Sequence, residues 1–137
     1  MNTSEIDLDK LFEEARKAAG FAYAPYSKFR VGAALLADDG SVITGCNVEN
    51  RSFGLTICAE RNAITKAVSL NLRSFKALAV STPDSKDPVG PCGACRQVLS
   101  EFMPPYAPVI FGGSGEEKVR TTVGVLYPFD SLHELAQ

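Results

Sequence analysis

The sequence predicts a three-layer α/β/α sandwich built around one mixed sheet of roughly five strands. Apolar residues recur with helical spacing in three separate stretches, and short apolar runs suited to strands lie between and after them. The expected order is helix, two strands, helix, strand, helix, two strands. No internal repeat, low-complexity tract or linker interrupts the 137 residues, so we expect a single domain over residues 1–137.

The first part of the chain predicts a helix followed by a β-hairpin. Apolar residues between Leu8 and Ala22 recur at helical spacing, with polar residues on the outer side. The stretch GFAYAPYSKF, residues 20–29, ends this pattern because Gly and Pro interrupt it. Two apolar runs within residues 30–48 then flank Asp39-Gly40, and these two residues tolerate positive φ in a tight turn.

The second part predicts helices alternating with strands. Residues 58–70, CAERNAITKAVSL, suit a mostly buried helix, and residues 76–82, KALAVST, suit a covered strand. A loop over 83–91 leads to a third helix over 93–103, which ends before two prolines. We expect the last strands at 108–111 and 119–126, and a short terminal helix over 130–136.

Composition and charge exclude several classes of protein. Hydrophobic residues make up 45% and charged residues 22%, which is typical of a globular chain. The formal net charge of −2 comes without a basic run, so we expect no nucleic acid polymer as a partner. No apolar run is long enough to span a membrane, and the acidic N-terminus is unlike a secretory signal. We therefore expect a cytoplasmic protein, where cysteines rarely form structural disulfides.

Three of the four cysteines lie in two short motifs that suit a metal ion. Cys58 begins a predicted helix in TICAERNAI, and Cys92 and Cys95 form a C-x-x-C motif in PCGACRQ. Helix N-termini favour the thiolate, and residues one turn apart share a face of the helix. Three thiolates would leave the fourth position of a tetrahedral Zn²⁺ site open for water. A dithiol redox pair at the C-x-x-C motif is the alternative.

Candidates for a fourth protein ligand are poor, which favours an open catalytic site. Cys46 lies in the hairpin and is more simply a small buried hydrophobe, and His133 is more simply a surface residue. Glu60 follows Cys58 by two residues and can point into the same cavity without binding the metal. A carboxylate there can take a proton from zinc-activated water and return it to a leaving group. Its simpler role would be to favour the helix dipole.

The motifs together resemble a known family. CAER with PCGACRQ is similar to the signature of the zinc nucleoside deaminases. AYAPYSKFRVGAAL and GCNVEN narrow this resemblance to the small-subunit, homotetrameric cytidine deaminases, for which cysteine at position 58 is typical. The match runs from about Phe21 to Gln97. It implies one Zn²⁺ per subunit, a cytidine deaminase-like fold and a homotetramer with active sites at subunit interfaces.

The resemblance also implies the reaction and roles for two residues beside the cluster. Cytidine and 2′-deoxycytidine would be hydrolysed to uridine and 2′-deoxyuridine with release of ammonia, a step of pyrimidine salvage. Glu60 would carry a proton first to N3 of the pyrimidine and then to the departing amino group. Arg61 would donate hydrogen bonds to the ligand sulfurs and draw off thiolate charge. An arginine exposed at the surface is its alternative.

Substrate contacts are implied by the same resemblance. Asn47 and Glu49 would hydrogen-bond the ribose hydroxyls, Phe29 would lie against the pyrimidine face, and the backbone N–H of Ala59 would donate to O2. Turn formation is the simpler role for the first two residues, and a place in the core is the simpler role for the phenylalanine.

Two positions depart from the family pattern. Phe53 stands where the family often has a tyrosine that reaches towards a neighbouring subunit's site. Phe129 follows Pro128 with a shorter spacing than the family tail has, so closure of a neighbour's site by Phe129 is an open expectation.

The residues leave two other activities open. One is an aminohydrolase for a modified cytosine nucleoside such as blasticidin S, and the other is a zinc-stabilised binding module without catalysis. Glu49 favours a plain nucleoside, because ribose hydroxyls need a polar partner. Glu60 favours catalysis, because a structural site has no use for a carboxylate beside an open position.

Overall fold

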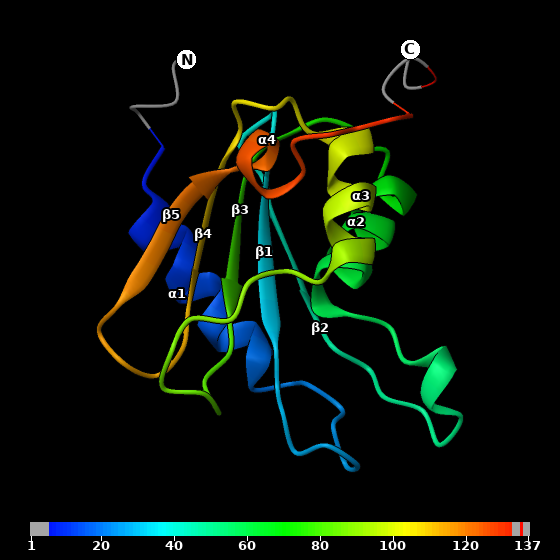
Figure 1. Cartoon of the computed structure of the whole chain (residues 1–137), viewed down its shortest axis with the longest axis vertical. Coiled ribbons are helices and arrows are strands. Elements are labelled where there is room, and N and C mark those ends of the chain that lie inside the picture. Colours follow the sequence, from blue (N-terminus) through cyan, green and yellow to red (C-terminus); the bar gives the residue numbers. More distant parts are fainter. Residues whose placement is uncertain (1–5, 133–134, 136–137) are drawn as a thin grey trace.

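The structure is a computed structural model in which residues 6–132 and 135 are described (Figure 1). Its centre is one sheet with the strand order β2-β1-β3-β4-β5. The strands β3 and β4 are parallel and the other pairs are antiparallel, so the mixed five-stranded sheet is confirmed. The strands are β1 (Gly32–Ala37), β2 (Val42–Cys46), β3 (Phe75–Ser81), β4 (Pro108–Gly112) and β5 (Lys118–Thr122).

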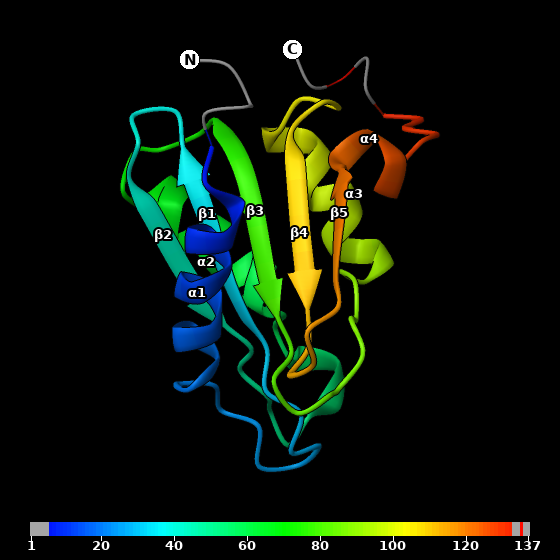
Figure 2. The ribbon, with the colours of Figure 1, turned by 90° about the vertical axis from the view of Figure 1, so that its left-hand side faces the viewer.

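Helices cover both faces of the sheet, as the sandwich prediction requires. The helix α1 (Leu8–Ala19) lies on one face, and α2 (Ala59–Ser69) and α3 (Gly93–Phe102) lie on the other (Figures 1 and 2). Each face has its own apolar cluster, because successive side chains of a strand point to opposite faces. Phe12 packs in the cluster under α1, while Leu35, Ile64 and Leu99 pack in the cluster under α2 and α3.

Two glycines allow the helices to approach the sheet closely. A Cβ at Gly32 would collide with backbone atoms of α1, and a Cβ at Gly45 would lie 2.5 Å from the backbone N of Ala63 in α2. The absence of a side chain at these positions therefore sets the separation between the sheet and both helical layers.

The end of the first helix agrees with the sequence prediction, and the end of the last strand differs from it. Helix α1 stops at Ala19, immediately before the predicted interruption, and the backbone N–H of Gly20 bonds to carbonyls of the last turn. The strand predicted to run to residue 126 stops at Thr122, whose hydroxyl accepts a hydrogen bond of 3.3 Å from the backbone N of Val125 and so starts α4 (Val123–Leu126). Part of the expected helix over 130–136, including His133, lies outside the described residues.

One end of the sheet gathers the segments that the sequence singles out. The strands β2 and β3 finish there, α2 and α3 begin there, and the loops over 20–31, 47–57 and 82–91 surround it (Figures 1 and 2). An isolated bridge between Tyr23 and Val48 joins the first two of these loops, and a second bridge, between Val48 and Ile57, closes the loop over 47–57 on itself. Among the helices described, none is long and apolar enough to cross a membrane.

Candidate active site

The three cysteines that the sequence singles out converge in space. Cys58 caps the N-terminus of α2, Cys92 caps the N-terminus of α3, and Cys95 lies in the first turn of α3. Their sulfur atoms all lie within 4.8 Å of one another, and the Sγ atoms of Cys58 and Cys92 are 3.9 Å apart. Tetrahedral Zn²⁺ with bonds of about 2.3 Å places two thiolate sulfurs about 3.8 Å apart. The spacing of this cluster therefore fits zinc.

The chemistry of the thiols also fits a cation. A hydrogen bond from the Cys95 thiol, helped by the Arg61 guanidinium, lowers the pKa of Cys58 to about 5 in the metal-free chain. The pKa of Cys95 is raised, because its thiol donates that hydrogen bond and because it is buried. Three thiolates cannot share so small a volume without a positive charge between them. All three are free cysteines, and the third thiol beside the C-x-x-C motif favours a metal centre over a dithiol pair.

Glu60 lies in the first turn of α2 and is only 4% exposed. Burial disfavours the charged form, and it raises the pKa of this carboxyl to about 7 in the metal-free chain. A carboxyl in this position can both accept and release a proton. The structure thus places a titratable acid two residues from a metal-ligating cysteine.

Arg61 is turned toward the sulfurs rather than toward solvent. Its Nη2 donates to the Sγ of Cys58 over 3.3 Å, and hydrogen bonds to Cys58 and Cys95 raise the pKa of the guanidinium. Its Nε is buried without a partner among the described residues. The exposed-surface alternative for Arg61 is therefore wrong.

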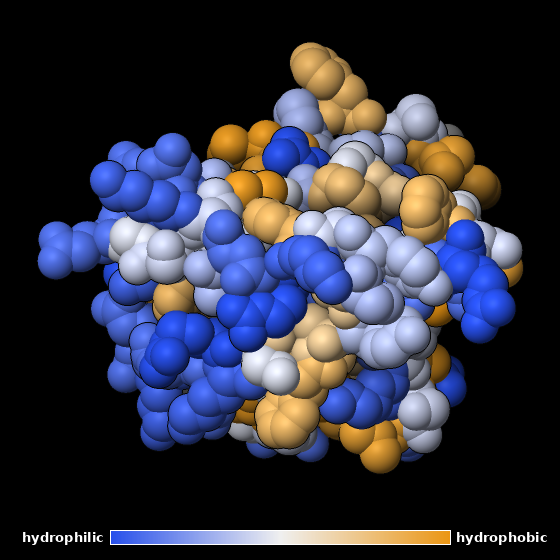
Figure 3. All heavy atoms as spheres, turned by 90° about the horizontal axis from the view of Figure 1, so that it is seen from below, coloured by the Kyte–Doolittle hydropathy of each residue, from blue (hydrophilic) through white to orange (hydrophobic). Residues whose placement is uncertain are grey.

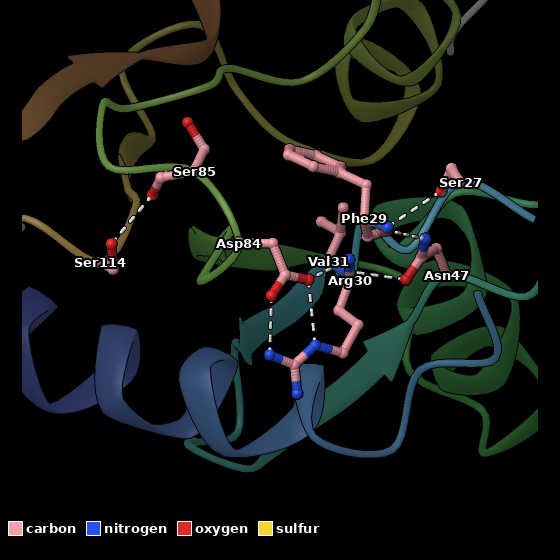
Figure 4. A network of polar contacts seen from close by, with 8 residues as sticks. All are labelled: Ser27, Phe29, Arg30, Val31, Asn47, Asp84, Ser85 and Ser114. Carbon is pink, nitrogen blue, oxygen red and sulfur yellow. Dashed lines mark hydrogen bonds and ion pairs between the residues drawn. The ribbon is translucent and has the colours of Figure 1, made fainter. Parts of the chain in front are cut away.

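Asn47 and Glu49 are buried and support the segment that carries Phe29. The Asn47 amide accepts from Val31 N over 2.9 Å and donates to Phe29 O over 2.8 Å. The Glu49 carboxylate accepts from Ser27 N over 3.1 Å and from the Ser27 hydroxyl, and these bonds lower its pKa. Both side chains thus fix the backbone of residues 26–31, and Figure 4 shows the contact of Asn47 with this segment.

Phe29 is half-buried and lies in a segment that other residues hold in place. Its N–H donates to the Ser27 hydroxyl over 3.0 Å, and the preceding residue, Lys28, has a φ of 61°. The ring points away from the Arg30 side chain (Figure 4). Ser27 could not be singled out from the sequence alone, although its place two residues before Phe29 suits a turn-forming hydroxyl.

Phe53 and Phe129 lie in different places. Phe53 is 72% exposed, stacks edge-on against Tyr26 with ring centres 5.6 Å apart, and lines a cavity of about 360 Å³ together with Glu49. Phe129 is 90% exposed, and its neighbours Pro128 and Asp130 line a different hollow near the C-terminal end of α3. Within one subunit, Phe53 is close to the predicted ribose contact and Phe129 is at the far end of α3.

Cys46 has no place in the thiol cluster among the described residues. It ends β2 half-buried, and its carbonyl accepts from Asn62 Nδ2 over 2.8 Å. Ala59 is fully buried at the start of α2, next to Glu60.

Comparison with known proteins places this geometry in a family. The family model described as the cytidine and deoxycytidylate deaminase zinc-binding region matches residues 6–111. A cytidine deaminase from Sporosarcina psychrophila is 53% identical over 123 residues, which cover 90% of each chain. A blasticidin-S deaminase from Bacillus cereus is 34% identical, and the match covers 93% of each chain.

A solved structure of similar shape comes from the same family. The crystal structure of cytidine deaminase from Burkholderia pseudomallei matches with a TM-score of 0.85 and 44% identity, over 90% of this chain and 98% of that one. The matched zinc-binding region contains all three converging cysteines, which supports one Zn²⁺ per subunit. The chain therefore belongs to the cytidine and deoxycytidylate deaminases.

Proposed function

We propose that the chain hydrolyses cytidine and 2′-deoxycytidine to uridine and 2′-deoxyuridine, with release of ammonia, and so serves pyrimidine salvage. The observation that carries this proposal is a buried carboxyl, Glu60, beside three cysteines whose spacing suits zinc. Family membership and identity of about half over most of the chain support it. The overall reaction consumes one water molecule and replaces the amino group at C4 by oxygen.

Cys58, Cys92 and Cys95 would hold the metal, and Glu60 would move the protons. When bound, Zn²⁺ lowers the pKa of a coordinated water to about 7 and so supplies a nucleophile at neutral pH. The Glu60 carboxylate would accept a proton from the attacking water and deliver it to N3 of the pyrimidine, which makes C4 more electrophilic while the water oxygen bonds to C4. Glu60 would then take the proton of the hydroxyl at C4 and pass it to the amino group, whose bond to C4 breaks as ammonia leaves and the C4 carbonyl forms. General acid–base catalysis of this kind contributes a factor of about 10² to 10⁴.

Substrate recognition is proposed for four residues around this centre. Phe29 lies against the pyrimidine face, and the backbone N–H of Ala59 donates to O2. Asn47 and Glu49 face the ribose, and their bonds to residues 26–31 keep them in fixed orientations before substrate arrives. The cavity of about 360 Å³ beside Glu49 supports the ribose assignment.

We propose further that four copies assemble and complete one another's sites. Large apolar side chains are exposed on the loops at the site end, among them Phe21, Phe53 and Leu55. Seen from that end, hydrophobic patches are concentrated in one half of the surface while the other half is mostly hydrophilic (Figure 3). Exposed apolar surface of this kind marks an interaction site. Phe53, beside the cavity, and Phe129 are the proposed contributions to a neighbour's site.

Two further points belong to the proposal. The three free thiols of the cluster suit a reducing, cytoplasmic environment, and we propose that residues 1–137 form one domain. A modified cytosine nucleoside is the second candidate substrate, because a blasticidin-S deaminase is 34% identical. The higher identity to cytidine deaminases, 53%, favours the plain nucleoside.

The test compares wild type with Glu60→Gln and with Glu101→Gln, a substitution of an exposed glutamate on α3. Ultraviolet absorbance of cytidine and the zinc content of each protein are measured together. We expect wild type and Glu101→Gln to consume cytidine, and Glu60→Gln to lose a factor of about 10² or more with its zinc retained. A wild-type protein that holds zinc yet leaves cytidine and deoxycytidine unchanged would overturn the proposal, and blasticidin S would be tried next.

A further inference from the structure

The segment that carries Phe29 is held in place by two sets of contacts. In the first set, the Ser27 hydroxyl accepts from the backbone N–H of Phe29, and the Asn47 amide, which follows β2, donates to the Phe29 carbonyl. In the second set, a single residue, Arg30, reaches across to Asp84 at the end of β3 (Figure 4). Residues 30 and 84 are 54 positions apart in the sequence.

Asp84 receives three hydrogen bonds from Arg30. Its Oδ2 accepts from the backbone N of Arg30 over 2.8 Å and from Nε over 3.0 Å, while its Oδ1 accepts from Nη2 over 2.8 Å. The forked guanidinium fixes direction as well as distance, which a lysine could not do. These bonds lower the pKa of Asp84 to about 2, so the carboxylate stays charged at any ordinary pH.

The loop that carries Asp84 is itself firmly held. The backbone N of Ser114, in the turn between β4 and β5, donates to Ser85 O over 2.7 Å, and the Ser114 hydroxyl donates to the same carbonyl over 3.3 Å (Figure 4). The carbonyl of the next residue in the chain, Lys86, accepts from Gly115 N over 3.1 Å. Gly113 packs so closely that a Cβ there would lie 2.8 Å from Asp87 O and closer still to Ser85 O. The loop is thus a rigid support rather than a free strand end.

The same loop leads directly to the metal ligands. Residues 82–91 join β3 to α3, and Cys92 caps α3 immediately afterwards. The Arg96 guanidinium holds the end of this loop, because its Nε donates to Pro91 O over 2.7 Å. A contact from Arg30 to Asp84 therefore connects the Phe29 segment with the chain that positions two of the three cysteines.

We propose that the Arg30–Asp84 pair is a positioning contact that sets the distance between Phe29 and the metal centre. The inference rests on the proposed function, in which Phe29 touches the pyrimidine. The side chains of Arg30 and Phe29 leave the backbone in opposite directions (Figure 4), so Arg30 does not reach the substrate and acts only through the segment. Loss of the contact would let the phenylalanine drift and so weaken its packing on the pyrimidine in the ground state and the transition state alike.

The chain offers a matched control of the same chemistry. Arg120 donates to Asp9 over 2.6 Å and joins β5 to α1. These two residues are also distant from each other in the sequence, but their contact lies away from the Phe29 segment. Exposed ion pairs of this kind are ordinarily worth no more than about fivefold in an equilibrium. A difference between the two pairs would therefore reflect what each pair holds.

The experiment measures kcat and KM for cytidine, zinc content, and amide hydrogen exchange in Asp84→Ala, Arg30→Ala, Arg30→Lys and Arg120→Ala. We expect Asp84→Ala to raise KM about tenfold with less effect on kcat, because a contact used equally in ground and transition states acts on KM. Arg30→Ala keeps the backbone N–H bond and should have a smaller effect, and Arg30→Lys a smaller one again. Exchange should rise in residues 26–31 in Asp84→Ala, and Arg120→Ala should match wild type in all four measurements.

A double-mutant cycle with Phe29→Ala tests whether the pair acts through Phe29. If it does, Asp84→Ala should change kcat/KM less than about twofold in the Phe29→Ala background. Full additivity overturns the proposal, as does unchanged exchange in residues 26–31 or a rise spread over the whole sheet. A wild-type protein that holds zinc but leaves cytidine intact would instead refute the proposed function. The exchange data would then test only whether the Arg30–Asp84 contact holds residues 26–31 in place.

Discussion

Arg61 donates to the sulfur of Cys58 at 3.3 Å, and this contact leads to a prediction about charge at the metal centre. Three thiolates carry more negative charge than one Zn²⁺ carries positive, which weakens its Lewis acidity. We expect Arg61→Gln to lower kcat by about 10- to 100-fold, the range for groups that hydrogen-bond metal ligands, and to change the affinity for zinc. Turnover of cytidine and zinc loss to a chelator are the measurements.

The control for this substitution is Arg16→Gln on α1, which removes an exposed arginine paired with Glu13. That variant should keep the wild-type rate and the wild-type response to chelator. If Arg61→Gln behaves in the same way as the control, the hydrogen bond to sulfur has no part in tuning the metal.

Asp84 predicts a dependence of stability on acid. Its pKa is about 2 in the folded chain and near 3.8 in an unfolded one, because Arg30 bonds the charged form. A carboxyl whose pKa is lower in the folded chain than in the unfolded chain stabilises the fold at pH values above its unfolded pKa. This stabilisation is lost as the pH falls from about 4 toward 2. The Tm of Asp84→Asn should therefore lie below that of wild type at pH 7, and the difference should shrink across that interval. A difference that stays constant from pH 7 to pH 2 would contradict this.

Single residues show what local sequence can and cannot reveal. Cys58, Cys92 and Cys95 were identifiable because thiols with this spacing have few other uses in a reducing environment, and the structure brings them together. Arg30 and Asp84 were not identifiable, because an isolated arginine and aspartate 54 positions apart give no local signal. Asp84 does follow the predicted strand over 76–82, and a carboxylate at a strand end is the one hint that the sequence offers.

At the scale of elements, the packing of α2 on β2 depends on Gly45. A Cβ there would lie 2.5 Å from Ala63 N and 2.6 Å from Ala59 O, which are backbone atoms that cannot move without moving the helix. We expect Gly45→Ala to lower the free energy of unfolding by about 1–3 kcal/mol and to weaken zinc binding, since α2 begins at Cys58. Denaturant unfolding and zinc titration measure the two effects.

Gly54→Ala is the matched control, because a Cβ at Gly54 meets nothing within 4 Å. It should leave both the unfolding free energy and the zinc affinity at their wild-type values. Loss of stability without loss of zinc affinity in Gly45→Ala would mean that the first turn of α2 stays in place when its middle is displaced.

Elements were predicted well where periodicity is strong and less well where it changes. The hairpin at Asp39-Gly40 and the three long helices follow from patterns that packing reinforces. The run VRTTVGVL is β-branched enough to suit one strand, yet the Thr122 hydroxyl caps a helical turn in its middle. Capping depends on which neighbours the segment has after folding, so propensity alone overestimates the strand.

At the scale of the whole molecule, the proposed tetramer gives a prediction about mass. A homotetramer should sediment at about four times the 14.7 kDa of one chain. Leu55 is 68% exposed beside Phe53, so Leu55→Glu places a charge on the apolar surface and should shift the equilibrium toward smaller species. Sedimentation velocity of wild type and variant, with activity recorded at each concentration, tests whether sites need a neighbour.

Val119→Glu on β5 is a control, because it puts the same charge on an exposed apolar residue of the opposite sheet edge. If both variants keep the mass of wild type, the surface around Leu55 is not the interface. If wild type sediments as a monomer and still deaminates cytidine, the assembly part of the proposal is wrong while the chemistry stands.

The sandwich architecture was accessible from the order of elements, because helices alternating with covered strands have few other ways to bury their apolar faces. What the order could not give is which end of the sheet the three loops share. That depends on the antiparallel pairing of β1 with β3 and the parallel pairing of β3 with β4. These pairings bring the separate loops and helix starts that lie between residues 26 and 96 to the same end of the sheet.

The tight turn at Asp38–Gly40 joins β1 to β2 at the end of the sheet away from the thiol cluster (Figures 1 and 2). Its residues are exposed, and Gly40 has open space around it. A surface linker would reach a handle built into this turn without crossing the loops around the metal centre. The molecule can therefore be immobilised by this turn on an electrode or bead with its catalytic end facing the solution, in an orientation suited to a sensor for cytosine nucleosides.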